Sequence, residues 1–208
     1  MTSGRCVVVV MAKAPVPGFA KTRLIPALGA EGAAALAQWL LDRTMAAALA
    51  ASAAGLGPVE LCGAPDMSHP AFDAWADRPG VVCAPQGAGD LGERMARVFE
   101  RWRHDAPGVL LIGTDAPRLG ADVLLAAAEA LQAHDAVFVP ACDGGYALVG
   151  LRRPAPQLFT GMRWSTADVM QHTRERLQAG ALRHAELAAL HDIDEPADLV
   201  HLQGLGWR

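Results

Sequence analysis

Short apolar runs alternate with longer stretches of helical periodicity along the whole chain. Cys6–Met11 is a continuous, mostly β-branched run, which is typical of a strand buried on both faces. Shorter runs predict further strands at Val59–Cys62, Val81–Cys83, Val109–Ile112, Ala136–Val139 and Tyr146–Gly150. The spacing of apolar positions predicts helices at Glu31–Ala54, Leu91–Arg103, Ala121–Ala133, Thr166–Leu177 (capped by Ser165) and Pro196–Gln203.

Strands and helices that alternate in this order predict a three-layer α/β/α sandwich with a mostly parallel sheet. No internal repeat or low-complexity linker divides the chain, so residues 1–208 are expected to form a single domain. In such sheets, ligands bind beyond the carboxyl ends of the strands. The loops that follow the strands are therefore where the chemistry is expected.

The composition indicates a globular protein without a general polyanion-binding surface. Hydrophobic residues make up 52% of the 208 residues and charged residues 19%, and the formal net charge is −4. A negative net charge gives no general attraction to nucleic acid or to an anionic membrane. A phosphorylated ligand must therefore be held locally, which favours a small molecule.

The chain is expected to be cytoplasmic. Its N-terminal segment lacks the longer apolar region of a signal peptide. The Ala-rich stretch from Ala33 to Ala54 contains Asp42 and Arg43, which disfavour membrane insertion and favour a helix of a soluble protein. The four cysteines are Cys6, Cys62, Cys83 and Cys142. They contain no C-x-x-C pair, so neither a zinc site nor a disulfide framework is expected. Three of them lie in or beside strand-like segments, where a free cysteine is a small buried hydrophobe.

The loop after the first predicted strand concentrates positive charge. Lys13, Lys21 and Arg23 lie within eleven positions, in a segment that two prolines and a glycine shape. Cations close to exposed backbone N–H groups suit a di- or triphosphate. The alternative is a solvated basic loop, but its place directly after a buried strand favours phosphate binding.

A second loop, Gln86-Gly-Ala-Gly89-Asp-Leu-Gly92-Glu-Arg94-Met, follows the third predicted strand. Glycines allow a ligand to approach the backbone, and the helix that follows begins with free N–H groups. Gln86 offers a donor and an acceptor together, which suits the edge of a nucleobase. Glycine-rich turns before helices are common, and Asp90 is equally explained as an N-cap.

Carboxylates occur in three further loops. Asp115 follows the fourth strand in Gly113-Thr-Asp-Ala-Pro117, where it is either a ligand of Mg²⁺ or Mn²⁺ or a helix-start residue. Asp143-Gly-Gly-Tyr146 is a hairpin signal, and Asp194 by itself is explained as a cap of the helix at Pro196. Together, these carboxylates are able to complete a metal site or to position an acceptor hydroxyl.

In combination, these segments resemble the nucleotide-diphospho-sugar transferase superfamily, the GT-A fold. More closely, the chain is similar to a bacterial family labelled glycosyltransferase, and also to the 2-phospho-lactate and molybdenum-cofactor guanylyltransferases. The matching segments run in order along nearly the whole chain: Lys13-Ala-Pro-Val-Pro-Gly, Lys21-Thr-Arg-Leu, the Gln86 loop, Gly113-Thr-Asp, Asp143-Gly-Gly-Tyr, Trp164-Ser-Thr and Asp192-Ile-Asp-Glu-Pro. One departure is the Pro-rich first loop, where nucleotidylyltransferases have an Ala-Gly-Gly type of loop.

The resemblance implies a role for each of these positions. Nucleotide binding would involve Lys13, Lys21, Arg23, Gln86, Gly87, Gly89 and Gly92. The metal, Mg²⁺ or Mn²⁺, would be held by Asp115 with Asp192 or Asp194. The acceptor or sugar would face Asp143, Gly144, Gly145, Tyr146 and Trp164. Catalysis would involve Asp115, Asp143 and Lys21.

Three functions are compatible with this pattern. The first is glycosyl transfer from a nucleotide-diphospho-sugar to a small acceptor, with the metal neutralising the departing diphosphate. The second is a nucleotidylyltransferase that attacks an NTP and releases pyrophosphate. The third is a non-catalytic nucleotide-binding regulatory module on the same fold. The partners expected are thus a nucleotide or nucleotide-sugar and a small acceptor, with no nucleic acid and no membrane insertion, while the base, sugar, acceptor and oligomeric state stay open.

Overall fold

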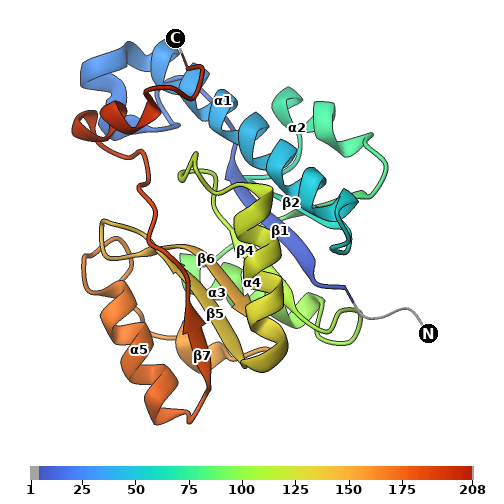
Figure 1. Ribbon diagram of the computed structural model, residues 1–208. Coiled ribbons are helices and arrows are strands. Elements are labelled where there is room, and N and C mark those ends of the chain that lie inside the picture. Colours follow the sequence, from blue (N-terminus) through green and yellow to red (C-terminus); the bar gives the residue numbers. More distant parts are fainter. Residues whose placement is uncertain (1–4, 208) are drawn as a thin grey trace.

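The computed structural model describes residues 5–207, which form one sheet with helices on both faces (Figure 1). Residues 1–4 and Arg208 lie outside the described residues. Residues 1–4 are part of the N-terminal segment in which no signal peptide is expected. Two layers of helices cover the two faces of a seven-stranded, mostly parallel sheet. This arrangement confirms the predicted three-layer α/β/α sandwich.

The predicted alternation of strands and helices is present with small shifts of the ends. The strands are β1 (Val7–Lys13), β2 (Val59–Ala64), β3 (Val81–Pro85), β4 (Val109–Ile112), β5 (Ala136–Pro140), β6 (Tyr146–Leu151) and β7 (His184–Glu186). The α-helices are α1 (Ile25–Ala53), α2 (Pro70–Ala76), α3 (Leu91–Arg101), α4 (Ala121–Ala133) and α5 (Val169–Ala179). Three short 3₁₀ helices complete the described chain: η1 (Thr22–Leu24), η2 (Pro156–Leu158) and η3 (Pro196–Leu202).

The strand order is β3-β2-β1-β4-β6-β5-β7. Strand β1 pairs in parallel with β2 on one side and β4 on the other, so the Cys6–Met11 run does lie in a central parallel strand. Strand β6 is antiparallel to both β4 and β5, whereas β5 and β7 are parallel. The carboxyl ends of β1 to β5 and of β7 therefore share one edge of the sheet with the start of β6.

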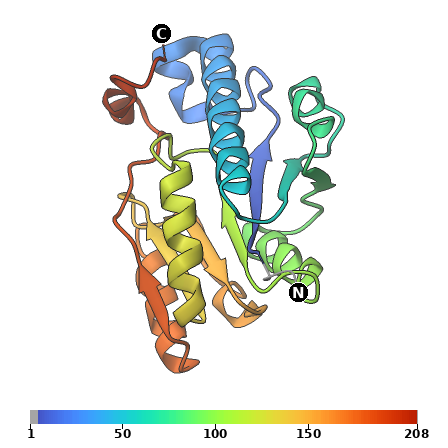
Figure 2. The same ribbon diagram turned by 45° about the vertical axis from the view of Figure 1, so that its right-hand side comes forward.

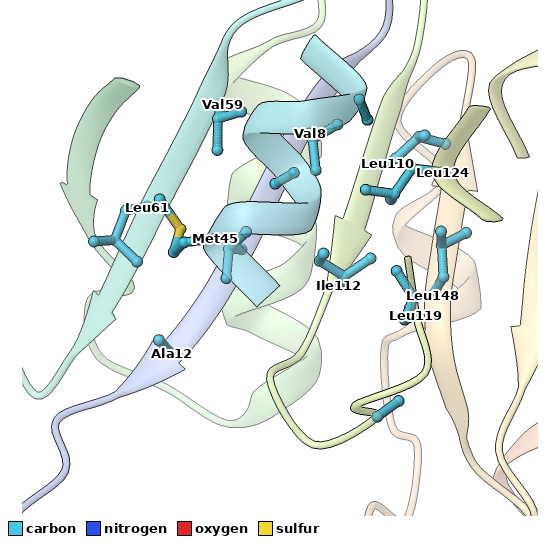
Figure 3. Close-up of a cluster of buried hydrophobic side chains, with 14 of the residues drawn as sticks. Val8, Ala12, Met45, Val59, Leu61, Leu110, Ile112, Leu119, Leu124 and Leu148 are labelled. Carbon is cyan, nitrogen blue, oxygen red and sulfur yellow. The ribbon is translucent and has the colours of Figure 1, made fainter. Parts of the chain in front are cut away.

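The consecutive valines of β1 are all buried because helices cover both faces of the sheet. Val8 and Val10 pack with the core of α1, α2 and α4, and Figure 3 shows Val8 between Val59 and Leu110 in this layer. Val7 and Val9 belong to the opposite cluster, which includes side chains of α3 and α5. The period of two along the strand thus divides its side chains between two cores.

Helix α1 is the main helix on its face of the sheet. Within the described residues, the stretch Thr22–Ala53 has the length and mean hydropathy, 1.3, of a possible membrane span. In the structure, its side chains Leu41, Met45 and Ala48 pack on the sheet, as those of a core helix do. The helix has a kink at Gly29, whose φ of 70° and ψ of 169° are not helical.

The range of α1 begins at Ile25, with Pro26 in its first turn, but the non-helical Gly29 divides it, and the long helix that follows Gly29 agrees with the predicted start at Glu31. Two expectations differ from the structure at helix starts. Helix α5 begins at Val169 with Asp168 at the N-cap position, so Ser165, which has a left-handed φ of 61°, lies before the cap and does not form it. The final helix is a 3₁₀ helix that Glu195 and Asp198 cap, so Asp194 is not its N-cap.

Helix α2, strand β7 and the short 3₁₀ helices η1 and η2 were not predicted, and one cysteine is placed differently. The seven residues of α2 and the three of β7 are too short to show a periodic pattern. Cys62 is buried and Cys6 partly buried, as expected of strand cysteines, but Cys83 is exposed because β3 is an edge strand. All four cysteines are free, as the sequence predicts.

The end of the chain packs on the beginning of α1. Leu24, Leu36 and Leu40 form a small core with Ile193 and Leu202. Figure 2 shows the red C-terminal segment running from β7 past the loop after β4 to reach the blue start of α1. This packing holds the segment that contains Asp192 and Asp194 across the carboxyl edge of the sheet.

Candidate active site

Loops from distant parts of the chain meet at the carboxyl edge of the sheet. The N–H group of Ile193 donates to the carbonyl of Asp115 at 2.9 Å, which joins the C-terminal segment to the loop after β4. The N–H group of Cys142 donates to the carbonyl of Leu190 at 2.9 Å, which joins the same segment to the β5–β6 turn. The predicted carboxylates of all three loops are thereby brought to one place.

Lys21 is the cation at the centre of this site. Its Nζ forms an ion pair with Asp115, donates to Asp194 Oδ1 at 2.8 Å, and donates to the carbonyl of Ile193 at 2.6 Å. The side chain is only 9% exposed. Burial alone would lower the pKa of Lys21, but the charges of Asp115 and Asp194 outweigh it and the pKa is raised. Lys21 therefore carries its charge within the site.

Three carboxylates form a compact group beside Lys21. One oxygen from each of Asp143, Asp192 and Asp194 lies within 4.8 Å of the other two. Burial, together with the negative charges of Asp143, Asp194 and Asp115, raises the pKa of Asp192 to about 6. The group thus holds more negative charge than its surroundings neutralise.

The compact carboxylate group overlaps only in part with the predicted metal ligands Asp115, Asp192 and Asp194. Asp143, for which the resemblance implies a role in catalysis and on the acceptor side, lies with Asp192 and Asp194 in the compact group. Asp115 does not belong to that group and contacts Lys21 instead. Because α4 starts only at Ala121, Asp115 is also not a helix-start residue.

The other two cations of the first loop are open to solvent. Lys13 is exposed at the end of β1. The Arg23 side chain is 59% exposed, and its Nη1 lies 3.9 Å from Glu195 Oε1, a distance that marks a weak surface pair. Both side chains are available to a ligand, whereas Lys21 is engaged by protein oxygens.

The glycine-rich loop after β3 has its carbonyls fixed by α3. Arg97 donates to the carbonyls of Gln86 and Ala88, at 2.5 and 2.8 Å, and Arg94 donates to that of Gly89 at 2.9 Å. Among the described residues, the N–H groups of Gly87, Ala88 and Gly89 have no protein acceptor. The loop therefore presents backbone donors, as expected for a site that receives a polar ligand.

Gln86 has a different place from the one expected. It is buried, and its side-chain nitrogen donates to the carbonyls of Ala12 and Cys62, both at 3.0 Å. Its amide nitrogen thus ties the loop to β1 and β2, and this placement favours a structural role over contact with a base. Asp90 and Glu93 form a capping box at the start of α3, so the N-cap interpretation of Asp90 is confirmed.

Close packing explains two of the glycines in these motifs. A Cβ at Gly92 would lie 2.7 Å from the Phe159 carbonyl and 3.0 Å from the Trp164 ring. A Cβ at Gly144 would lie 2.0 Å from the carbonyl oxygen of Ala167, and the φ of Gly144 is +94°. Both glycines therefore bring the Trp164–Ala167 segment against the site's loops.

The Asp143-Gly-Gly-Tyr turn joins β5 to β6, as its sequence predicts, and Gly145 N donates to Asp143 Oδ1 at 2.8 Å. The Tyr146 ring packs edge-to-face against Trp164, with centroids 6.5 Å apart, and its hydroxyl lies 4.0 Å from Met95 Sδ. Burial raises the pKa of Tyr146. Its hydroxyl is thus directed towards the core, while the indole nitrogen of Trp164 is buried without a hydrogen-bond partner among the described residues.

Sequence reasoning missed two contributors to the site. Arg97 holds the carbonyls of the glycine-rich loop, and the carbonyl of Ile193 accepts from Lys21. The three-residue spacing of Arg94 and Arg97 on a helix places them on one face, next to the loop, so this role could have been found. A backbone carbonyl has no sequence signal.

The residues present fit a hard divalent cation. Carboxylate oxygens are the protein ligands that Mg²⁺ and Mn²⁺ prefer, usually one or two of them with phosphate oxygens and water. The compact group offers three such oxygens within reach of one ion, and the raised pKa of Asp192 indicates that positive charge is lacking there.

Comparisons with known proteins show the family of the chain. The family model described as "Uncharacterized protein conserved in bacteria (DUF2064)" matches residues 44–166. A solved structure from Desulfovibrio desulfuricans G20, described as a "putative nucleotide-diphospho-sugar transferase", is 31% identical, with a TM-score of 0.86 over 96% of this chain and 87% of that chain. No curated protein matches the chain in sequence at a significant level.

More distant solved structures share the fold alone. The 2-C-methyl-D-erythritol 4-phosphate cytidylyltransferase of Thermus thermophilus is 18% identical, with a TM-score of 0.55 over 97% of this chain and 98% of that chain. Rv0371c of Mycobacterium tuberculosis H37Rv, in a complex with manganese, is 18% identical, with a TM-score of 0.54 over 95% and 97%. In sequence and fold, the chain is a transferase of the nucleotide-diphospho-sugar transferase superfamily, and it belongs to the bacterial family DUF2064.

Proposed function

We propose that the protein transfers a glycosyl group from a nucleotide-diphospho-sugar to a small acceptor, with Mg²⁺ or Mn²⁺ at the carboxyl edge of the sheet. The observation that carries this proposal is the convergence of four carboxylates and one buried lysine from four separate loops: Asp115, Asp143, Asp192, Asp194 and Lys21. A diphosphate cannot approach so many carboxylates unless a cation lies between them. The relative at 31% identity, which is described as a transferase of this kind, supports the same assignment.

The proposed ligand extends from the first loop to the glycine-rich loop. Lys13 and Arg23 are exposed on the segment that follows the buried part of β1 and hold the phosphates. The free N–H groups of Gly87 and Gly89 bind the nucleoside part. When bound, the metal neutralises the diphosphate leaving group, using Asp192 and Asp194 with Asp115 or Asp143 as its protein ligands.

The acceptor is placed on the side of the β5–β6 turn. Asp143 lies at the junction of the carboxylate group and this turn, so it is positioned to accept the proton of an acceptor hydroxyl. Gly144, Gly145, Tyr146 and Trp164 form the wall there, with Tyr146 contributing its ring rather than its hydroxyl. A cytoplasmic location agrees with the free cysteines.

Nucleotidyl transfer is the second candidate. One observation favours it: the Thermus thermophilus cytidylyltransferase matches over nearly the full length of both chains, 97% and 98%, so this single domain is of the size that such an enzyme uses. In this reaction an acceptor phosphate attacks the α-phosphate of an NTP, and pyrophosphate leaves. Lys13 and Arg23 would then stabilise the departing pyrophosphate.

The products separate the two candidates. The protein with Mn²⁺ is incubated with panels of nucleotide-sugars and of NTPs, together with small hydroxyl and phosphate acceptors. Release of a nucleoside diphosphate supports glycosyl transfer, and release of pyrophosphate supports nucleotidyl transfer. Asp115→Asn should reduce turnover at least about a hundredfold, as losing a key electrostatic group does. Asp105→Asn, an equal charge change at an exposed site, should leave turnover unchanged. Full activity of Asp115→Asn would refute the site.

A further inference from the structure

Lys21 has no donor left for a phosphate in this structure. An ammonium group has three N–H donors, and those of Lys21 face Asp115, Asp194 and the carbonyl of Ile193. These three oxygens surround a buried positive charge in the way that they would surround a bound metal ion. The predicted role of Lys21 as a phosphate ligand therefore requires that it leave these partners.

Asp194 is shared between Lys21 and the compact carboxylate group. Its Oδ1 accepts from Lys21 at 2.8 Å, while one of its oxygens also lies within 4.8 Å of those of Asp143 and Asp192. A divalent cation that enters the group needs this same carboxylate and is repelled by the ammonium beside it. Lys21 and the metal thus compete for one ligand and for the same negative charge.

The backbone of Lys21 has a φ of 47° and a ψ of 45°, the left-handed region that residues with a Cβ rarely adopt. Its carbonyl accepts from the N–H group of Leu24 at 2.9 Å, at the start of η1. The ion pairs of the side chain add to this backbone contact in holding the conformation, so their loss removes part of what keeps the side chain in place.

We propose that Lys21 is an exchangeable internal counter-cation, which occupies the carboxylates until a divalent metal displaces it and which then binds the nucleotide phosphates. This inference rests on the metal-dependent function proposed above and adds an order to it. Metal entry frees the ammonium, so phosphate binding is coupled to metal binding. Without metal, Lys21 neutralises the carboxylates and the first loop offers only Lys13 and Arg23.

The two lysines of the chain allow a direct test on the native protein. Lys21 is nearly buried and ion-paired, whereas Lys13 is exposed on the same loop and serves as the internal reference. Brief acetylation followed by peptide mass spectrometry gives the ratio of modification at the two side chains. Saturating Mn²⁺ alone should raise the Lys21 to Lys13 ratio severalfold. An unchanged ratio under conditions where Mn²⁺ is bound would overturn the proposal.

The affinity for Mn²⁺ provides a second test, because it should rise on removal of Lys21 if Lys21 competes with the metal and should not rise if Lys21 only positions the carboxylates. Lys21→Met removes the competing charge and keeps an apolar stem, so Mn²⁺ affinity, measured by electron paramagnetic resonance without nucleotide, should rise about tenfold. Lys21→Arg retains the charge and should keep the affinity of the native protein. If Lys21 merely positions the carboxylates, Lys21→Met will bind Mn²⁺ equally or more weakly, and the proposal fails.

The failure of this inference differs from the failure of the proposed function. Unchanged acetylation of Lys21 and an unchanged affinity for Mn²⁺, together with metal-dependent product formation, would contradict the displacement of Lys21 by the metal and leave the transferase assignment intact. Absence of any metal-dependent nucleotide binding in the native protein would instead remove the proposed function. Native and variant proteins are compared by circular dichroism, and the labelling of native protein does not depend on how the variants fold.

Discussion

At the scale of single residues, the absence of a Cβ at Gly144 sets the shape of the β5–β6 turn. Gly144 lies in the β5–β6 turn with a φ of +94°. Its N–H group donates to the carbonyl of Ala141 at 3.1 Å, and its carbonyl accepts from the N–H group of Met170 at 2.8 Å. A Cβ there would be only 2.0 Å from the carbonyl oxygen of Ala167. The turn and the segment before α5 can therefore meet only through a glycine.

Gly144→Ala should destabilise the protein by about 3 kcal/mol or more, because it adds a backbone clash to the strain of a positive φ. Urea unfolding followed by circular dichroism measures this change. Gly161→Ala is the matched control, since Gly161 has a φ of +65° but nothing within 4 Å of the added Cβ. It should cost about 1 kcal/mol, the strain alone. Equal losses in both variants would show that the Ala167 contact does not constrain the turn.

At the scale of elements, an ion pair attaches the end of α3 to the sheet. Glu60 of β2 is 1% exposed, and it accepts from Arg101 and, at 2.5 Å, from the indole nitrogen of Trp102. Helix α3 also holds the glycine-rich loop through Arg94 and Arg97. The anchor at one end of the helix thus supports the glycine-rich loop at the other.

Arg101→Met should destabilise the protein by about 2–3 kcal/mol, because it leaves the Glu60 carboxylate buried with only the Trp102 donor. The estimate lies below the full cost of breaking a buried pair, since the Arg101 side chain is 31% exposed. Arg103→Met, which breaks the exposed pair with Glu100, should change the free energy of unfolding by less than about 0.5 kcal/mol. Chemical denaturation compares the two, and an equally small loss for Arg101→Met would exclude the anchor.

At the scale of the whole molecule, the site exists only in the folded sheet. Its carboxylates are brought together by β4, by the β5–β6 turn and by a C-terminal segment that packs on α1. A ligand that binds these loops therefore binds the native state and not the unfolded chain. Binding must then raise the stability of the entire domain.

Mn²⁺ together with the correct nucleotide or nucleotide-sugar should raise the melting temperature. At a hundredfold excess over Kd, the stabilisation is about 2.7 kcal/mol, which corresponds to roughly 5–10 °C for a domain of this size. Differential scanning fluorimetry with a panel of nucleotides, each with and without Mn²⁺, measures the shift. Asp192→Asn, which removes a charge from the compact carboxylate group, should lose the metal-dependent part of it. A shift of equal size without metal would contradict the metal-dependent site.

Much of the fold could be predicted because its signals are local. The β-branched run of β1 and the apolar periods of α3 and α4 record burial directly in the sequence, and those elements lie where the patterns predict them. Short elements such as α2 and β7 carry too few residues for a period to show. Exposure of Cys83 depends on β3 being an edge strand, which is a property of strand order.

The candidate site divides in the same way between local and global causes. The sequence by itself determined which loops carry carboxylates, glycines and cations, because parallel strands bring all those loops to one edge. Only the tertiary structure decided that Asp143 joins Asp192 and Asp194, and that Lys21 faces Asp115 and Asp194. These partners lie far apart along the chain, and their meeting depends on the strand order and on the packing of the C-terminal segment against α1.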